Sequence, residues 1–436
     1  MAVIGLFGAW VVLLVAMLIP VHILPSMILA VYALLPLGAI SAGPLASFPA
    51  LGLLFLIWLV RRRFTAPIDQ VGLYSNATRS AVLTVATVLF LGWCGVSVFL
   101  SDYRLNSLSW VFSAIVGIGP GLMANQPVRE AEILKKTWIY LGVVFGAYAS
   151  IEGALQSNFI YGPLNALFGQ ESTQHWSVYR AEGSFGHPLA LSTFLAIALS
   201  LAVTLGAQRW TPTLAVSAGL ILAGLVATAS RGGLLAGGIG VLIGVLMMLT
   251  AVDRTKRSRI VLTLGAAGAA AALVLQSALI QARGESVEAT RSSAARVQVT
   301  EQAMQTLRQS NWLGTGGGTS SRVIMDAGSP VPLENSALQV LVSLGIPGAI
   351  LMAALLWMLL IKGTASRDAA AVGALVALCI AYLGYNAFDD KPSMHIVIGL
   401  VFLMLNGSSQ QMYRARTIGA GPLAGPLTVG SKKKRA

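Results

Sequence analysis

Charged residues are scarce in this sequence: they make up 10% of its 436 residues, against roughly 25% in an ordinary soluble domain. Hydrophobic residues make up 56%, which excludes a soluble globular enzyme. Cysteine is almost absent, and Cys94 and Cys379 both lie in apolar runs, so neither a disulfide framework nor a C-x-x-C metal site is indicated. The net charge of +13 does not point to nucleic acid, because the basic residues must first be placed relative to a membrane.

Apolar segments of about the 20 residues that a bilayer core requires recur along nearly the whole chain. The sequence therefore predicts an all-α integral membrane protein, a polytopic bundle of 12 or 13 transmembrane helices. The first sixty residues hold two or three of them, because four prolines interrupt this stretch. The predicted spans are residues 3–18, 23–37, 45–60, 81–100, 110–123, 138–155, 189–205, 214–229, 234–251, 260–280, 338–361, 369–387 and 395–405.

The spans and loops divide the chain into six parts. N-terminal helices (1–155) precede a first external loop (156–187), central helices (188–280) and a large external loop (281–334). C-terminal helices (335–406) and a basic tail (407–436) follow, and the tail has the composition of a disordered cytoplasmic segment. The first apolar run is expected to be an uncleaved span rather than a signal peptide.

Basic residues are divided unequally between the two sides of this topology. Of the 29 Lys and Arg residues, 20 fall on one side, which the positive-inside rule makes cytoplasmic. Eight of the nine on the external side are arginine, whose planar guanidinium can hold a phosphate at two points. We therefore expect the chemistry on the external face. The nine are Arg104, Arg180, Arg231, Arg283, Arg291, Arg296, Arg308, Arg322 and Lys391.

Arg231 lies in a segment that joins two apolar runs with almost no loop between them. A charge at the membrane boundary is costly without a partner, and the glycines that follow it let a backbone or a headgroup approach closely. Either an anionic lipid-linked ligand supplies that partner, or the side chain extends into lipid headgroups from a tight hairpin.

The large external loop carries two features. Residues 288–310 have the composition of an amphipathic helix lying on the membrane, with Ala295, Val299, Ala303 and Leu307 on one face. Its basic residues are Arg291, Arg296 and Arg308. The glycine-rich residues 311–321, with Gly316, either turn several backbone N–H groups toward one anion or form a flexible linker; no P-loop pattern is present.

Glu334 and Asn335 stand immediately before the apolar run 338–361. Gly345 and Gly348 fall on the same stripe of the predicted helix as Glu334, which suggests tight helix contact there. The carboxylate either interacts favourably with the helix dipole or orients and deprotonates an acceptor hydroxyl, as a general base does.

The first external loop ends with Trp176, Arg180 and His187 among further aromatic and polar residues. This pattern suits a sugar, whose apolar face stacks on aromatic rings, and equally an interfacial aromatic belt. His187 is either a ligand contact or, at the head of a span, a cap or a packing residue. Asp389 and Asp390 are expected in a solvated turn, and no metal site or cofactor is indicated.

An ordered set of these residues resembles the O-antigen ligase and O-antigen polymerase superfamily. The set is Arg180-x-x-Gly183 with Pro188, Ser230-Arg231-Gly232, Arg296, Trp312-Leu-Gly314-x-Gly316, and Glu334-Asn335 with Gly345-x-x-Gly348. Family members often carry His, then Asn, Ser or Gln, nine residues, and Gly-x-x-Gly; here Glu334 occupies the histidine position.

The resemblance implies a membrane transferase of the GT-C type in the bacterial inner membrane, with its active site facing the periplasm. The donor would be a glycan on undecaprenyl diphosphate, transferred without metal to a hydroxyl of another carrier-linked glycan (polymerase) or of lipid A core (ligase). Arg231, Arg296 and Glu334 would be catalytic. The other contacts expected for the diphosphate or the glycan are Arg180, Arg291, Asn335, Gly316, His187 and Trp176.

The missing histidine favours a polymerase of exopolysaccharide, capsule or O-antigen repeats, which could also have a chain-length regulator as a partner. A flippase of lipid-linked glycans is less well supported, because it should line its spans with charges, whereas nearly all charge lies in loops and Glu152 is the clearest exception.

Overall fold

The computed structural model describes residues 17–36, 50–65, 77–124, 127–167, 177–208, 211–251, 254–277, 281–282, 287–329 and 331–408. Every regular element within these ranges is a helix. The elements are α2 (Leu24–Leu34), α4 (Ala50–Thr65), α5 (Ala77–Ser97), α6 (Arg104–Met123), α7 (Val128–Leu155), α8 (Tyr161–Leu167), η4 (Gly183–Phe185), α9 (Pro188–Gln208), α10 (Pro212–Ala227), α11 (Arg231–Ala251), α12 (Arg254–Leu275), α14 (Val287–Gln309), α15 (Ser320–Asp326), α16 (Ser336–Ala365), α17 (Ala369–Tyr382), η5 (Pro392–Met394) and α18 (His395–Asn406).

Six of the described helices, α6, α7, α9, α11, α12 and α16, are long and apolar enough to cross a membrane. The chain is therefore an α-helical membrane protein. Other apolar helices are shorter: α17 has 14 residues, about 21 Å at 1.5 Å per residue, against a bilayer core of about 30 Å. The total of 12 or 13 spans is not reproduced by this criterion and stays a prediction. Residues 3–16 of the first predicted span lie outside the described residues.

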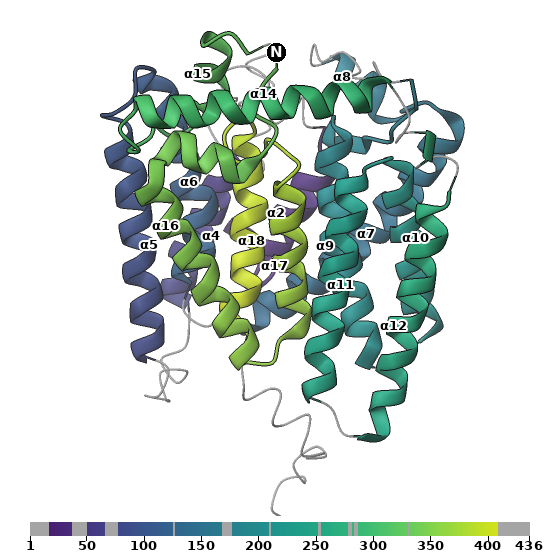
Figure 1. Ribbon diagram of the computed structural model, residues 1–436. Coiled ribbons are helices and arrows are strands. Elements are labelled where there is room, and N and C mark those ends of the chain that lie inside the picture. The colour runs from purple at the N-terminus through teal and green to yellow at the C-terminus, as the bar shows by residue number, and fades with distance from the viewer. Residues whose placement is uncertain are drawn as a thin grey trace, which may run out of the picture.

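The longer helices run side by side, and α14 lies across one end of them (Figure 1). We call this the capped end; α7, α10 and α12 finish there, and α9, α11, α16 and α18 begin there. The loops that the sequence places outside the membrane all meet at this end. The sequence-predicted site residues that the structure describes are therefore gathered on one side of the bundle.

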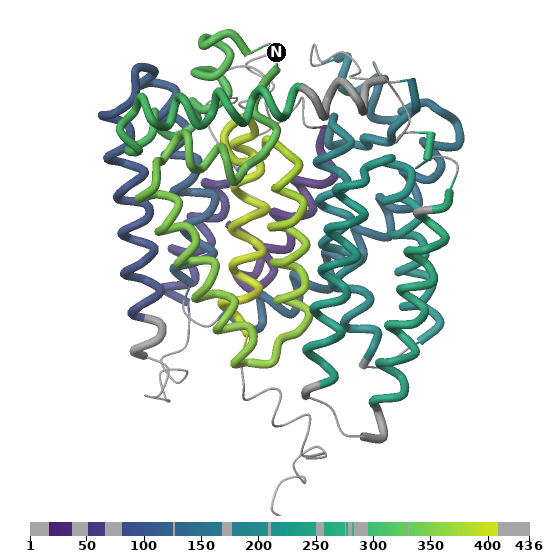
Figure 2. Tube along the Cα trace, viewed as in Figure 1, coloured from purple at the N-terminus to yellow at the C-terminus, as the bar shows by residue number. Residues whose placement is uncertain are grey.

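The middle of the bundle consists of helices that are apolar on all sides. Every residue of α18 is buried; α17 and α18 run through the middle (Figure 2), where α17 packs on α9 and α11, and α18 packs on α6 and α7. Backbones come close where glycines meet: a Cβ added to Gly224 would lie 2.4 Å from the Cα of Gly146. Close contacts between small residues are typical of helix packing in membranes.

The amphipathic helix predicted for residues 288–310 is confirmed as α14. Val299, Ala303 and Leu307 are buried, and Val299 and Ala303 pack in a small cluster with Ile324 and Leu333. This part of the apolar face thus contacts α15 and the start of α16 rather than lipid alone. The packing fixes where the basic side chains of α14 stand above the bundle.

The uninterrupted helix predicted for residues 338–361 is wrong, because α16 is broken at Gly345. That residue has φ 68° and ψ −173°, a conformation that is essentially restricted to glycine. Pro347 follows two residues later and has no N–H to continue the helical bonding. Gly345 is therefore a break point, and the Gly-x-x-Gly spacing does not describe one continuous helix face.

Residues 312–316 bond to the backbone of α16 at the break. Thr315 N donates to the carbonyl of Val342 and Gly316 N to that of Ser343, both at 2.9 Å, while Ile346 N donates to the carbonyl of Trp312 at 2.9 Å. The indole of Trp93 donates to the carbonyl of Leu344 at 2.7 Å. Since buried backbone groups need partners at membrane depth, these bonds replace the helical ones that the break removes.

We predict that Gly345→Ala destabilises the protein by about 1–3 kcal/mol, the usual cost of a backbone conformation that other residues avoid. The added Cβ would also stand 2.3 Å from the carbonyl carbon of Leu313. Thermal unfolding in detergent measures the effect. Gly268→Ala on α12 is the matched control, because nothing lies within 4 Å of its added Cβ; equal melting temperatures for the two variants would contradict the prediction.

Candidate functional site

Arg296 and Glu334, expected from separate segments of the large loop, meet at the capped end. Nη2 of Arg296 lies 3.2 Å from Oε2 of Glu334, and their side chains are 56% and 40% exposed. α14 carries the arginine, and the carboxylate stands two residues before α16 begins. The pair is therefore open to solvent and to a ligand approaching this end.

Asn335, and not Glu334, caps the N-terminus of α16. Its Oδ1 accepts hydrogen bonds from Ala337 N at 2.9 Å and Leu338 N at 3.1 Å, as an N-cap asparagine does. The carboxylate of Glu334 is directed to Arg296 instead. Asn335, rather than Glu334, therefore makes the side-chain hydrogen bonds at the N-terminus of α16.

The backbone N–H groups of the glycine-rich segment turn inward. Gly316 N bonds within the break of α16, and Gly317 N donates to Ser97 Oγ at 3.2 Å. Gly318 N and Ser320 N donate to the carboxylate of Asp389 at 3.3 and 3.2 Å. The segment does gather N–H groups around an anion, as its composition suggested, but that anion is a side chain of the protein itself.

The expectation that Asp389 lies in a solvated turn is wrong, because its side chain is 3% exposed. Besides the two backbone bonds, it accepts from Ser320 Oγ at 2.5 Å and from Ser343 Oγ. Burial raises its pKa to about 7, against the lowering effect of the hydrogen bonds from Ser320 and Ser343. Neighbouring Asp390 is partly buried and accepts from Ser321 Oγ at 2.7 Å.

Sequence reasoning missed Asp389 because its partners are far away along the chain. Ser343 is 46 residues distant and Gly318 is 71 residues distant. No local spacing could indicate that these groups would meet. The only local signal is an acidic residue directly after the apolar Ala387 and Phe388.

Arg180 is buried beside the turn that joins α10 to α11. Its Nε donates to the carbonyl of Thr228 at 3.1 Å, and the next residue, Ala181, donates its N–H to the carbonyl of Ala227 at 3.0 Å. These carbonyls belong to the end of a helix, where a cation is favoured. Arg180 therefore holds the turn in place from the first external loop.

Glu152, the exceptional charge within a span, anchors the same loop. Its carboxylate accepts from Tyr179 OH at 3.1 Å and from Glu182 N and Gly183 N, each at 3.0 Å. The side chain is fully buried. Its role in the structure is to fix the segment that carries Arg180, rather than to line a path through the membrane.

Arg231 begins α11 and is exposed. Ser230 before it accepts from Gly233 N at 3.0 Å and from Ser192 Oγ of α9 at 3.2 Å. Ala229 has φ 47°, so the tight hairpin expected here is present. Because Arg231 is exposed at this turn, a ligand can reach it.

His187 serves as a cap, as one of the sequence alternatives proposed. Its Nδ1 accepts from Leu189 N at 3.2 Å, and its ring stacks on Tyr385 with centroids 5.6 Å apart. Burial, and then the charges of Arg180 and Lys391, lower its pKa to about 3, so the ring stays neutral at physiological pH. Because Nδ1 is an acceptor, the proton of the neutral ring is on Nε2.

The loop after α17 connects the start of α16, next to Glu334, with His187 in the first external loop. Ser336 Oγ donates to the carbonyl of Tyr385 at 2.6 Å and accepts from Ala387 N and Phe388 N. Tyr385 in turn stacks on His187. From the start of α16, next to Glu334, a series of contacts therefore runs through this loop to the first external loop.

Two expected residues cannot be placed fully. Trp176 lies outside the described residues, and of Arg291 only the backbone, in α14, is described. Among the described side chains, no three His, Cys, Asp or Glu residues lie together as metal ligands would.

Residues 216–353 match the family model described as O-antigen ligase. This segment belongs to the O-antigen ligase family. Among curated proteins, no match to the chain is found.

The O-antigen ligase match begins within α10 and ends within α16. It includes Arg231, the helix that carries Arg296, the glycine-rich segment, Glu334 and the break at Gly345. Arg180, His187 and Asp389 lie outside it, yet Arg180 is bonded to Thr228 and Asp389 to Ser343, both of which belong to the matched part.

We predict that the stability of the protein falls between about pH 4 and 7 because of Asp389. In the folded state its pKa is about 7, whereas an unfolded Asp loses its proton near about 3.9. The folded protein therefore binds more protons in this window, and raising the pH weakens it. Melting temperatures from pH 5 to 8 should show the advantage of the wild type over Asp389→Asn shrinking as pH rises. Parallel curves would mean that Asp389 does not titrate in this window.

Proposed function

We propose that this protein is a glycan polymerase of the bacterial inner membrane whose capped end faces the periplasm. It would transfer an oligosaccharide from undecaprenyl diphosphate to a hydroxyl of another carrier-linked glycan. The observation that carries the proposal is the Arg296 and Glu334 pair at the mouth of the broken α16, within a segment of the O-antigen ligase family. A bundle of 12 or 13 spans of the GT-C type would carry this site.

The chemistry requires a nucleophile, a leaving group and a place for one proton. The acceptor hydroxyl oxygen forms a bond to the anomeric carbon, while the bond from that carbon to the diphosphate oxygen breaks and its electron pair leaves with the diphosphate. Arg231 and Arg296, both exposed, would stabilise the developing charge on the leaving group. Glu334 would accept the hydroxyl proton.

The ion pair between Arg296 and Glu334 would couple binding of the donor to activation of the acceptor. A diphosphate is a strong competitor for a guanidinium, so donor binding to Arg296 would displace Glu334. The released carboxylate would then be available to the acceptor. In this scheme Arg180 supports the turn before Arg231, because it is buried and bonded to Thr228.

Ligation to lipid A core is the alternative, since ligase and polymerase share the donor and differ in the acceptor. The carboxylate at the family's histidine position favours the polymerase. A flippase is less well supported: the buried charges of α7 are paired, Glu152 with a loop and Lys135 with Asp368 at 2.5 Å near the other end of the bundle. Such pairing does not make a charged transit path.

Reconstitution tests the proposal. Purified protein receives carrier-linked repeat units from its native pathway with no other acceptor, and the glycans are separated on a gel. A ladder of repeats supports the polymerase. Transfer only after addition of lipid A core supports the ligase, and no transfer in either condition by folded protein contradicts glycan transfer altogether.

We predict that Arg231→Ala and Arg296→Ala each lower transfer by about 100- to 1,000-fold, the usual effect of removing a group that stabilises a developing charge. Both side chains are exposed, so the variants should fold normally. Arg308→Ala is the matched control, because this arginine is also exposed and lies on the same helix as Arg296. If all three variants kept normal activity, the arginines would not bind the diphosphate.

We predict that Glu334→Gln lowers the rate of transfer by about 100- to 10,000-fold, as loss of a general base does, while donor binding persists. Glutamine keeps the shape of the side chain but accepts the hydroxyl proton far less well. The rate and the affinity for the donor are measured separately. A fully active Gln variant would mean that Glu334 is not the general base and only pairs with Arg296.

A further inference from the structure

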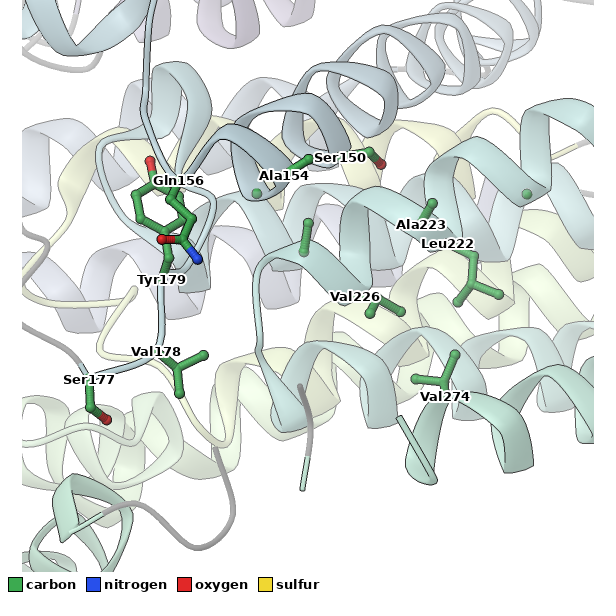
Figure 3. Close-up of a pocket in the computed structure, with 13 residues that line it drawn as sticks. Ser150, Ala154, Gln156, Ser177, Val178, Tyr179, Leu222, Ala223, Val226 and Val274 are labelled. Carbon is green, nitrogen blue, oxygen red and sulfur yellow. The ribbon is translucent and has the colours of Figure 1, made fainter. Parts of the chain in front are cut away.

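A cavity of about 810 Å³ lies between α7, α10 and α12 near the capped end. We call it the α10 groove (Figure 3). Its volume is within the range of small-molecule sites. The lining residues are Ser150, Gly153, Ala154, Gln156, Ser177, Val178, Tyr179, Gly219, Leu222, Ala223, Val226, Ala227 and Val274.

The groove is apolar along most of its length and polar at one end. Gly219 and Ala227 of α10 both line it and are eight residues apart, so the groove follows that helix for about 12 Å. In Figure 3, Tyr179 and Gln156 lie at one end, and Leu222 and Val274 lie toward the other. A hydrocarbon chain with a polar head has this distribution of chemistry.

The side of the groove is open to the membrane. Ala154, Gly219 and Ala223 are exposed, and only 11% of the apolar window of α12 is buried within the protein. A lipid could therefore enter sideways without leaving the bilayer. Glycine and alanine on this surface leave room for the methyl branches of an isoprenoid chain.

The polar end of the groove meets the turn between α10 and α11, which Arg180 and Arg231 flank and which we call the cationic turn. Tyr179 lines the groove and directly precedes Arg180; Ala227 lines it and directly precedes Thr228, whose carbonyl accepts from Arg180. The turn that follows ends at the exposed Arg231. A chain in the groove would thus place an anionic head beside this arginine.

Glu152 fixes the position of this end. Its carboxylate holds the hydroxyl of Tyr179 and the N–H groups of Glu182 and Gly183, so the loop that closes the groove is anchored to α7. The distance between the hydrocarbon site and the cationic turn is therefore set by the fold. An amphiphile with a fixed junction between chain and diphosphate suits such a site better than a sugar, which would leave hydroxyls against an apolar wall.

We propose that the α10 groove binds the hydrocarbon chain of the polyprenyl diphosphate carrier. The assignment rests on the proposed function for the identity of the carrier. It places the chain against α10 and the diphosphate at the turn before α11. The glycan would then extend over the capped end toward Glu334.

Two glycines make a matched test. An added Cβ has nothing within 4 Å at Gly219, which lines the groove, or at Gly238, which lies on α11 outside it. Gly219→Phe should fill the groove, while Gly238→Phe should only add a ring on an exposed surface. Melting temperatures verify that both variants fold, and Ala223→Phe replaces Gly219→Phe if that variant does not.

The probe is undecaprenyl diphosphate without a glycan, and native mass spectrometry measures its binding to the full-length protein. We expect Gly219→Phe to bind at least about tenfold more weakly than the wild type, and Gly238→Phe to bind normally. Equal binding by all three would overturn the assignment. Displacement of the probe by an equal amount of dioleoyl phosphatidylglycerol would also overturn it, because the groove would then accept any membrane lipid.

This measurement needs no transfer reaction. If the probe binds in the groove but no glycan is transferred by folded protein, the proposed function fails and the groove assignment stands. If transfer occurs and Gly219→Phe binds the probe normally, the groove assignment fails and the proposed function stands.

Discussion

The capped end depends on the requirement that backbone N–H and C=O groups be paired within a membrane protein. At Gly345 the helical hydrogen bonding of α16 is interrupted. Residues 312–316 and Trp93 form hydrogen bonds with the backbone groups that the interruption leaves. The loop after α14 is therefore fixed to α16 rather than only tethered to it. Because that loop continues directly from α14, the helix break also decides where Arg296 stands. One local loss of helical bonding thus positions a charged group that is far from Gly345 in sequence.

The buried carboxylate of Asp389 also fixes the loop between α17 and α18. Asp389 receives two backbone N–H groups and two serine hydroxyls, which offsets much of the cost of burying a carboxylate. It joins the glycine-rich segment and α16 to the loop between α17 and α18. That loop in turn carries Tyr385, which stacks on His187. The two external loops are consequently held by one connected set of contacts between segments that are distant in sequence.

The hydrophobic pattern of the sequence predicted those features that depend on residues close together in the chain. It located the long apolar helices and the buried face of α14, since such faces repeat every three or four residues. It could not predict the break in α16, because apolar residues continue on both sides of Gly345 and small residues at this spacing also suit tight helix contact. Resemblance indicated Arg296 and Glu334 as functional, but only the fold shows that they touch. Asp389 was misjudged since its burial is decided by partners from two distant segments, the glycine-rich segment and α16.

Burial separates the arginines of the capped end into two kinds. Arg180 cannot change partner without leaving the carbonyl of Thr228 without its hydrogen bond, and an unpaired buried carbonyl is costly. Arg296 is more than half exposed and is paired with a carboxylate that is also partly exposed, and an exposed pair of this kind contributes little to stability. Exchanging Glu334 for an incoming anion would therefore cost little free energy. A charged group that can change partners at little cost, carried on a helix whose following loop is bonded to α16, is the combination that a site for an anionic ligand requires.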